Sequence, residues 1–118
     1  MLLLRNAEGL LLLEQRPPAG IWGGLWSLPE CPADTEPTEF CQTSLGLVMN
    51  DAEAGPRLRH TFSHFHLDIT TLQARVSASN HSIMEGRPQV WYNSRRPDAR
   101  GLPAPVKALL EGLDDLPE

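Results

Sequence analysis

The chain has 118 residues, of which 41% are hydrophobic and 21% are charged, and its formal net charge at pH 7 is −5. This composition predicts one globular domain over residues 1–118, and the acidic balance argues against a nonspecific DNA-binding protein, since such proteins are usually basic. The longest apolar run, Leu10 to Leu13, is too short to span a membrane, and no signal peptide is recognisable. We therefore expect a cytoplasmic protein without membrane contacts, and a monomer.

The first elements expected along the chain are two strands joined by a turn. Leucine-rich segments over 2–5 and 10–16 are predicted to be the strands. Between them, Asn6-Ala7-Glu8-Gly9 has the composition of a turn, because Gly9 can adopt positive φ without steric cost. An antiparallel hairpin therefore opens the chain.

A glycine-rich segment, residues 20–26, follows the hairpin and leads into a short strand over 25–28. It holds Trp22 and Trp26 among three glycines, a combination typical of large side chains fixed where the backbone bends sharply. We expect both tryptophans to anchor this segment in the core rather than to stack on bases.

The next segment predicts a helix over about residues 36–45. Asp34 and Thr35 are candidates for its N-cap, and Gly46 is a typical C-terminal stop. Apolar side chains recur at helical spacing within it. Residues 51–56 predict a loop.

The remaining elements are further strands and a second helix. We expect strands over 57–62, 65–76 and 89–93, loops over 77–86 and 95–101, and a helix over 104–113. A mixture of strands with two main helices places the chain in the α+β or α/β class.

The most unusual stretch runs from Arg59 to Asp68 and holds three of the four histidines and two of the three phenylalanines. Apolar side chains occupy even positions up to Phe62 and odd positions from Phe65 onward. Such a change of parity implies a turn or a bulge. We therefore predict a tight tip at Phe62-Ser63-His64 between two strands. We expect Phe65, Leu67 and Ile69 to be buried in the core.

The histidines allow a second interpretation, which is a zinc site. On an unbroken strand, one face would carry His60, His64, His66 and Asp68, a plausible ligand set. The break in parity argues against an unbroken strand, so we expect no metal here.

The chain has only two cysteines, Cys31 and Cys41. Their number and spacing do not suit an iron–sulfur cluster, which needs four ligands. We expect free, partly buried thiols, with a disulfide as the alternative.

Three blocks of sequence cover most of the chain. They are Gln15 to Trp26, Arg59 to Leu67, and Trp91-Tyr92-Asn93 followed by Gly101 to Val106. Together they resemble the C-terminal domain of bacterial MutY-family adenine DNA glycosylases. The resemblance implies a Nudix-like α/β/α sandwich around a mixed sheet.

The Nudix hydrolase signature gives a direct test of catalysis. When its end is aligned on Gly46-Leu47, its three core glutamates are replaced by Phe40, Thr43 and Ser44. Magnesium prefers carboxylate oxygens, so we expect this helix to be structural and the chain not to hydrolyse pyrophosphates. Two alternatives stay open. One is a protein-interaction module, and the other is a hydrolase whose metal ligands have moved to Glu14, Glu30, Glu36, Glu39 or Glu53.

The resemblance also implies a division of labour. The catalytic carboxylates and the iron–sulfur cluster of such glycosylases lie in an N-terminal domain, which would be the partner of this chain. The chain itself would be non-enzymatic and would recognise 8-oxoguanine opposite adenine in duplex DNA. The implied reading residues are Phe62, Ser63 and His64. Without the resemblance, the alternatives are a core phenylalanine, an ordinary turn serine and a solvated surface histidine. Further candidates for DNA contacts are Arg59, His60, Thr61 and His66. The alternative is that these four side chains have structural roles or are simply exposed to solvent.

Overall fold

The computed structural model describes residues 1–78, 88–93 and 101–113 of the chain. The elements in chain order are β1 (Leu2–Arg5), β2 (Leu11–Gln15), β3 (Trp26–Ser27), α1 (Pro37–Phe40), the π-helical turn η1 (Cys41–Leu45), β4 (Leu47–Thr61), β5 (His66–Ala78), β6 (Gln89–Tyr92) and α2 (Ala104–Leu113). The predicted helix over 104–113 is confirmed to the residue, and the strands expected over 2–5, 10–16, 25–28 and 89–93 agree closely. The predicted loops over 77–86 and 95–101 lie largely outside the described residues.

The turn between β1 and β2 is held by the side chain of Asn6. Its Oδ1 accepts hydrogen bonds from the backbone N–H groups of Glu8 and Leu10, each at 3.0 Å. Gly9 has a φ of 81°, a conformation that costs glycine little. The predicted opening hairpin is therefore confirmed, with the residues that were expected to make it.

The strands form one six-stranded mixed sheet in the order β3-β2-β1-β5-β4, with β6 paired to β2. Only β1 and β5 run parallel among these pairs; the others are antiparallel. In the described ranges, no helix is long and apolar enough to cross a bilayer.

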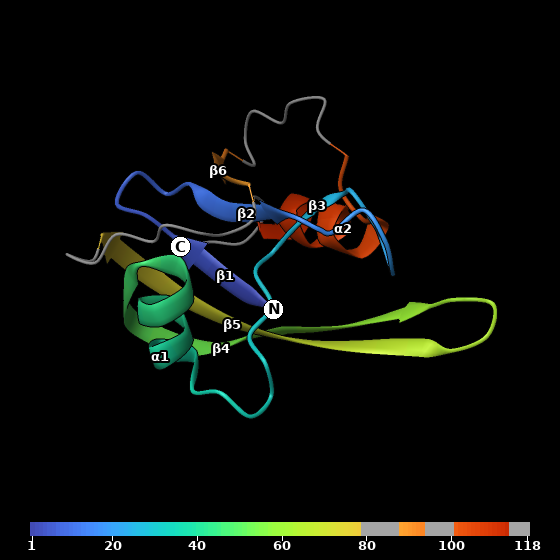
Figure 1. The fold of residues 1–118 in the computed structure, drawn as a ribbon, viewed down its shortest axis with the longest axis horizontal. Coiled ribbons are helices and arrows are strands. Elements are labelled where there is room, and N and C mark those ends of the chain that lie inside the picture. The colour runs from blue at the N-terminus through green and yellow to red at the C-terminus, as the bar shows by residue number, and fades with distance from the viewer. Residues whose placement is uncertain (79–87, 94–100, 114–118) are drawn as a thin grey trace.

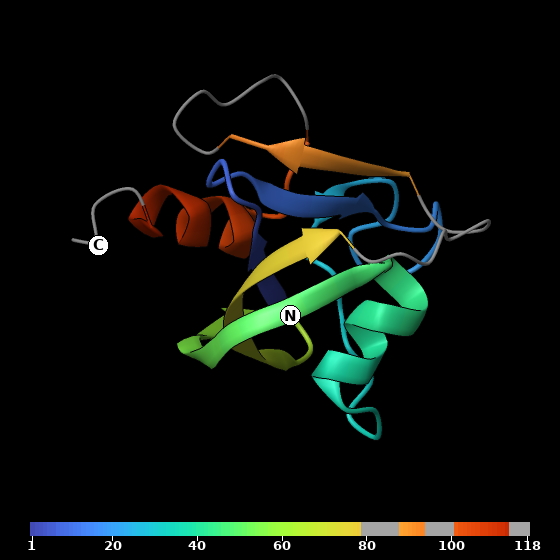
Figure 2. The same cartoon turned by 90° about the vertical axis from the view of Figure 1, so that its left-hand side faces the viewer.

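The leucine-rich first strands form the middle of the sheet, and both of their faces are buried. On one face, Leu3, Leu11 and Leu13 pack in a cluster with α2, and on the other face the alternate leucines pack in a cluster with η1. The two helical elements therefore cover opposite faces of the sheet (Figures 1 and 2). A strand buried on both faces needs a continuous apolar run, which explains the leucine repeats. The α/β/α sandwich around a mixed sheet is confirmed.

The first helical segment runs from Pro37 to Leu45, and Gly46 ends it with a φ of 67°. Its boundaries agree with the prediction, but the N-caps expected at Asp34 and Thr35 are wrong. The cap position is Glu36, whose side chain makes no capping hydrogen bond. Pro37 follows directly, and because proline has no N–H group, this helix start has one fewer donor to satisfy.

The loop predicted over 51–56 is also wrong, because β4 runs through it without interruption. The pairing of β4 with β5 shifts register between Asn50 and Glu53 and again between Ala54 and Arg57. Asp51 lies in the first of these irregularities with a φ of 53°. Bulges use the same polar, glycine and proline residues as loops, so local composition did not distinguish them.

Beyond these bulges, residues 57–61 and 66–70 form a two-stranded ribbon, which we call the arm. It projects from the body of the molecule, and the loop at its end, residues 62–65, is the tip (Figure 1). The long β4–β5 hairpin thus carries the predicted site away from the sandwich core.

Candidate nucleic-acid interface at the end of the arm

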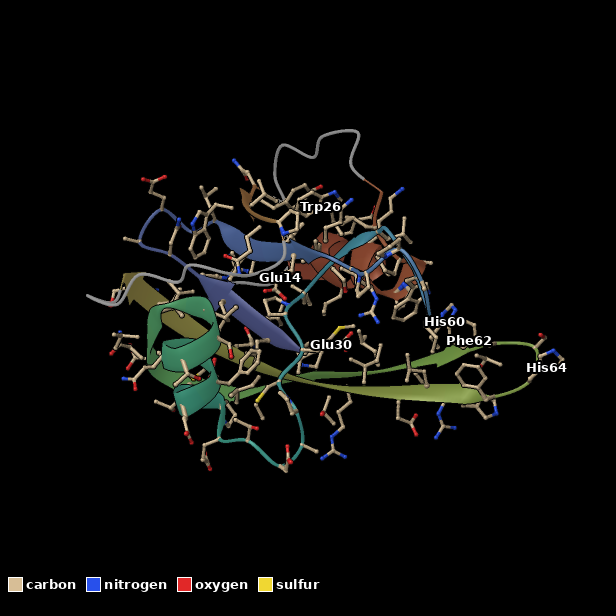
Figure 3. The ribbon with its side chains drawn as sticks, viewed as in Figure 1. Glu14, Trp26, Glu30, His60, Phe62 and His64 are labelled. Carbon is tan, nitrogen blue, oxygen red and sulfur yellow. The ribbon has the colours of Figure 1, made fainter. Side chains whose placement is uncertain are left out.

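The tip is a four-residue loop closed by one backbone hydrogen bond. The N–H of Phe62 donates to the carbonyl oxygen of Phe65 at 2.8 Å, next to the last strand pair, Thr61 and His66. Ser63 and His64 are exposed, and His64 lies at the outer end of the arm (Figure 3). The strand–tip–strand arrangement that the parity change predicted is confirmed.

Cross-strand pairing explains the parity change itself. Leu58 lies opposite Ile69 and His60 lies opposite Leu67, so even positions of β4 share a face with odd positions of β5. The tip alone therefore produces the change of parity. Ile69 is buried, as expected. Leu67 was also expected in the core but is only half-buried, because it lies further out on the arm and joins neither core cluster.

Four rings gather on this face of the arm, and we call them the aromatic cluster: Trp22, His60, Phe62 and Phe65. Phe62 stacks on Phe65 with centroids 4.6 Å apart, and His60 meets Phe62 edge-on at 4.6 Å. Trp22 reaches both His60 and Phe62 at 5.8 Å from the glycine-rich segment, far away in sequence. Aromatic pairs of this kind contribute about 0.5–1.5 kcal/mol each beyond their buried area.

Two expectations about aromatic residues need correction. Phe65 was expected in the core but is 45% exposed, because it lies in the tip loop and packs only on Phe62 among the described rings. Trp22 was also expected in the core, yet it is half-buried against the arm. Trp26 does pack against the core cluster under α2, as expected.

The opposite face of the arm is polar. Arg59 Nε donates to Asp68 Oδ1 at 2.7 Å, and Thr61 Oγ1 lies 2.9 Å from His66 Nδ1. The hydrogen bond from Arg59 lowers the pKa of Asp68, and the same bond raises the pKa of Arg59. Arg59, a candidate DNA contact, is therefore tied to a carboxylate of its own strand pair.

The arm divides the residues that were considered for zinc. His60 belongs to the aromatic face, whereas His66 and Asp68 pair with residues of the polar face. Among the residues that the structure describes, no group of three or more His, Cys, Asp or Glu side chains is placed to hold a metal ion.

The helix at the hydrolase signature has structural contacts. Phe40 packs against the core cluster under η1, and Thr43 Oγ1 donates to the carbonyl oxygen of Glu39 at 2.9 Å. Two of the other glutamates considered as ligands are engaged elsewhere (Figure 3). Glu14 accepts a hydrogen bond from Gln89 at 2.9 Å, and Glu30 pairs with Arg16. Among the described residues, neither carboxylate belongs to a group of three or more side chains that could hold a metal ion.

Both cysteines are free, as expected. Burial raises the pKa of the Cys41 thiol to about 11, and burial is also the main cause of the raised pKa of Cys31. Both side chains are therefore protonated at neutral pH, a form that is a poor nucleophile and a poor metal ligand.

The structure brings some predicted site residues together and separates others. Phe62 and His60 share the aromatic cluster, Ser63 and His64 extend beyond it, and the polar face carries Arg59, Thr61 and His66. Sequence reasoning did not assign Trp22 to this site. Its only local signal was a large aromatic residue flanked by glycines, which does not reveal a contact with a segment about 40 residues away.

Comparisons with known proteins agree with this fold. The model of a NUDIX domain matches residues 1–112. An adenine DNA glycosylase from Buchnera aphidicola subsp. Acyrthosiphon pisum (strain APS) is 37% identical over 54 residues, which is 46% of this chain and 15% of that relative. The match thus spans only a small part of the relative's length.

Solved structures show the same fold at low identity. A Nudix hydrolase from M. smegmatis, RenU, matches with a TM-score of 0.58 and 17% identity over 97% of this chain and 81% of its own. A MutT protein from Methanosarcina mazei Go1 matches with the same TM-score and identity over 97% of this chain and 89% of its own.

Proposed function

The chain belongs to the NUDIX domain family, in the type that forms the C-terminal domain of MutY-family proteins, and from this membership we propose that it reads 8-oxoguanine opposite adenine for an adenine DNA glycosylase. The observation that carries the proposal is the position of Phe62-Ser63-His64 at the outer end of the arm, where a hydroxyl and an imidazole extend beyond an aromatic stack. The glycosylase relative supports the class of parent protein.

The chemistry of the lesion sets what a reader must offer. Guanine presents N7 as an acceptor in the major groove. In 8-oxoguanine, N7 carries a hydrogen and C8 carries a carbonyl. A protein that reads the lesion must therefore place an acceptor near N7 and a donor near O8. Ser63 Oγ can accept and donate, and the backbone of the tip loop offers both functions as well.

The three reading residues have different roles in this proposal. Ser63 contributes a neutral hydrogen bond, worth about 0.5–1.5 kcal/mol. Phe62 wedges or stacks beside a base, an interaction of about 1–3 kcal/mol, with Phe65 supporting its other side. His64, at the outer end, stacks or contacts a phosphate.

The acidic character of the chain fits a module that does not grip DNA by itself. With a net charge of −5, it provides little attraction for phosphates. The proposal therefore assigns the main contacts with DNA phosphates, the catalytic carboxylates and the iron–sulfur cluster to an N-terminal domain of the same bacterial protein. The chain contributes recognition and no chemical step.

A fusion of this chain to the catalytic domain of an adenine DNA glycosylase tests the proposal. Single-turnover excision of adenine would be compared opposite 8-oxoguanine and opposite guanine. Replacing Phe62, Ser63 and His64 by alanine should reduce the preference for 8-oxoguanine by at least about tenfold, given the interactions lost. The matched control replaces three exposed residues of the first helical segment, Glu39, Gln42 and Ser44, and should leave the preference unchanged.

An unchanged preference in the tip variant would rule out the tip as the reader. A titration of the chain with 8-oxoguanine duplex, followed by amide shifts, distinguishes the remaining classes. Shifts at residues 60–66 support reading, whereas their absence throughout the chain supports a protein-interaction module. Turnover of a nucleotide panel with magnesium would support a hydrolase instead.

A further inference from the structure

The arm needs support from outside its own two strands. β1 pairs with β5 only from Leu72 to Arg75, so in the described sheet the ribbon over 57–61 and 66–70 has no third strand. An isolated two-stranded ribbon is marginally stable in water. Leu58 packs against the core at its base, but the tip lies further out. Whatever holds the tip must therefore reach it from another element.

Trp22 makes that contact. Its ring lies 5.8 Å from the ring of His60 and 5.8 Å from the ring of Phe62, on the face of the arm turned toward the body. Its backbone is left-handed, with a φ of 56°. A bulky residue adopts this conformation only where the surroundings impose it, and such residues are found at positions with a functional constraint.

The loop that carries Trp22 is fixed by its own hydrogen bonds. The N–H of Gly24 donates to the carbonyl oxygen of Pro17 at 2.9 Å, and the N–H of Leu25 donates to the carbonyl oxygen of Trp22 at 3.1 Å. Gly23 packs so closely on Pro18 that a Cβ atom would meet its carbonyl oxygen at 2.5 Å. Only glycine fits at this position, and the close contact restricts the loop to this backbone conformation.

Arg16 links this loop to the body. Its Nε donates to the carbonyl oxygen of Ile21 at 2.9 Å, and its guanidinium lies 5.9 Å from the Trp22 ring centroid. The same guanidinium pairs with Glu30, and the Arg16 N–H donates to the Leu25 carbonyl oxygen at 2.8 Å. A continuous series of contacts thus runs from the end of β2 through Trp22 to Phe62.

We propose that Trp22 is a positioning residue that sets the orientation of the tip through His60 and Phe62, with Arg16 holding the indole in place. The inference rests on the proposed function for its purpose, which is lesion reading, but the contact itself does not depend on it. A reader fixed in its bound orientation loses less conformational freedom on binding, and so discriminates better.

The contact can be tested on the chain without DNA. Trp22→Phe and Trp22→Leu have the same backbone strain and differ in the ring. We expect Trp22→Leu to move the ring-proton shifts of His60 and Phe62 and to lower the amide order parameters of residues 62–65, and Trp22→Phe to restore much of both. Ile21→Ala changes an exposed neighbour in the same loop and should alter neither. Unchanged shifts and order parameters in Trp22→Leu would overturn the inference.

The consequence for reading is tested in the glycosylase fusion. Trp22→Leu should lower the preference for 8-oxoguanine over guanine by about three- to tenfold, the equivalent of a lost aromatic contact, and Trp22→Phe should recover most of it. If the tip alanines abolish the preference while Trp22→Leu keeps it, the positioning inference fails and the proposed function stands. If Trp22→Leu loosens the tip but neither variant changes the preference, the proposed function fails and the structural contact stands.

Discussion

On the polar face of the arm, the side chain of Arg59 is engaged by Asp68 through a hydrogen bond of 2.7 Å. Asp68→Asn removes the negative charge and frees the guanidinium to meet a phosphate. We expect tighter DNA binding by the glycosylase fusion, and a slope of log affinity against log salt that is steeper by about one. A salt titration of duplex affinity measures both.

The control for this prediction is the double variant Asp68→Asn with Arg59→Gln, which removes the cation as well. Its salt slope should return to that of the unmodified fusion. If Asp68→Asn alone leaves the slope unchanged, Arg59 is not near a phosphate in the complex, and its pairing with Asp68 is its whole role.

Cys41 gives a pH prediction at the residue scale. It is 0% exposed, and burial raises its pKa from 9.0 to about 11. Because the folded state disfavours the thiolate, the stability tied to the protonated thiol is fully present below about pH 9 and is lost as the pH rises through about 11. The loss by pH 11 should be about 2 kcal/mol, as an order of magnitude.

Urea unfolding between pH 8 and pH 11 checks this, with Cys41→Ala as the reference that subtracts the contribution of all other titratable groups. The variant starts from a lower stability because a buried side chain has been shortened. Its stability should nevertheless fall less steeply with pH than that of the unmodified chain. Parallel curves would mean that the thiolate is accommodated in the folded state.

At the element scale, the bulged part of β4 directly precedes the arm, and bulges bend a strand and increase its twist. Gly55 lies within the second register shift, between Ala54 and Arg57, and packs on Thr71, whose Oγ1 donates to the carbonyl oxygen of Pro56 at 2.6 Å. A methyl group at Gly55 would overlap Thr71 Oγ1 and press on Gln73. Gly55→Ala should therefore cost about 1–3 kcal/mol of unfolding free energy.

The matched control for Gly55→Ala is Gly112→Ala in α2, where an added Cβ meets nothing within 4 Å. Alanine is the better helix former, so this variant should be neutral or more stable by up to about 1 kcal/mol. Denaturant midpoints compare the two variants. Equal effects at both positions would show that the contact of Gly55 with Thr71 is not tight in solution.

The contrast between α2 and β4 shows what local sequence can predict. The apolar spacing and flanking prolines of α2 are local signals, and the helix over 104–113 was predicted to the residue. The strand through 51–56 was missed because its evidence is the pairing with β5, which local composition does not contain. The contact between Trp22 and Phe62 was missed for the same reason, since it joins segments that meet only after folding.

At the scale of the whole molecule, the two buried clusters complete the sandwich without the tip. Their members come mainly from the sheet and its two helical elements, with Leu28 just after β3, and from the arm only Leu58 packs against them. Changes at the tip should therefore affect recognition more than stability, which is the separation that the fusion experiments require. Because the net charge is −5, the proposed recognition of DNA should depend little on a general electrostatic attraction between this chain and DNA.

These two properties lead to a prediction about salt. Absolute affinity of the fusion for duplex DNA should fall steeply as salt rises, because phosphate contacts release counterions. The ratio of affinities for 8-oxoguanine and guanine duplexes should stay nearly constant, since Phe62 and Ser63 are uncharged and salt screens mainly charged contacts. Paired titrations from about 50 to 200 mM salt measure both quantities over a range in which phosphate binding changes strongly. A ratio that falls toward one with rising salt would mean that discrimination comes from charge, and would move the reading role from the hydroxyl and aromatic groups to His64 or Arg59.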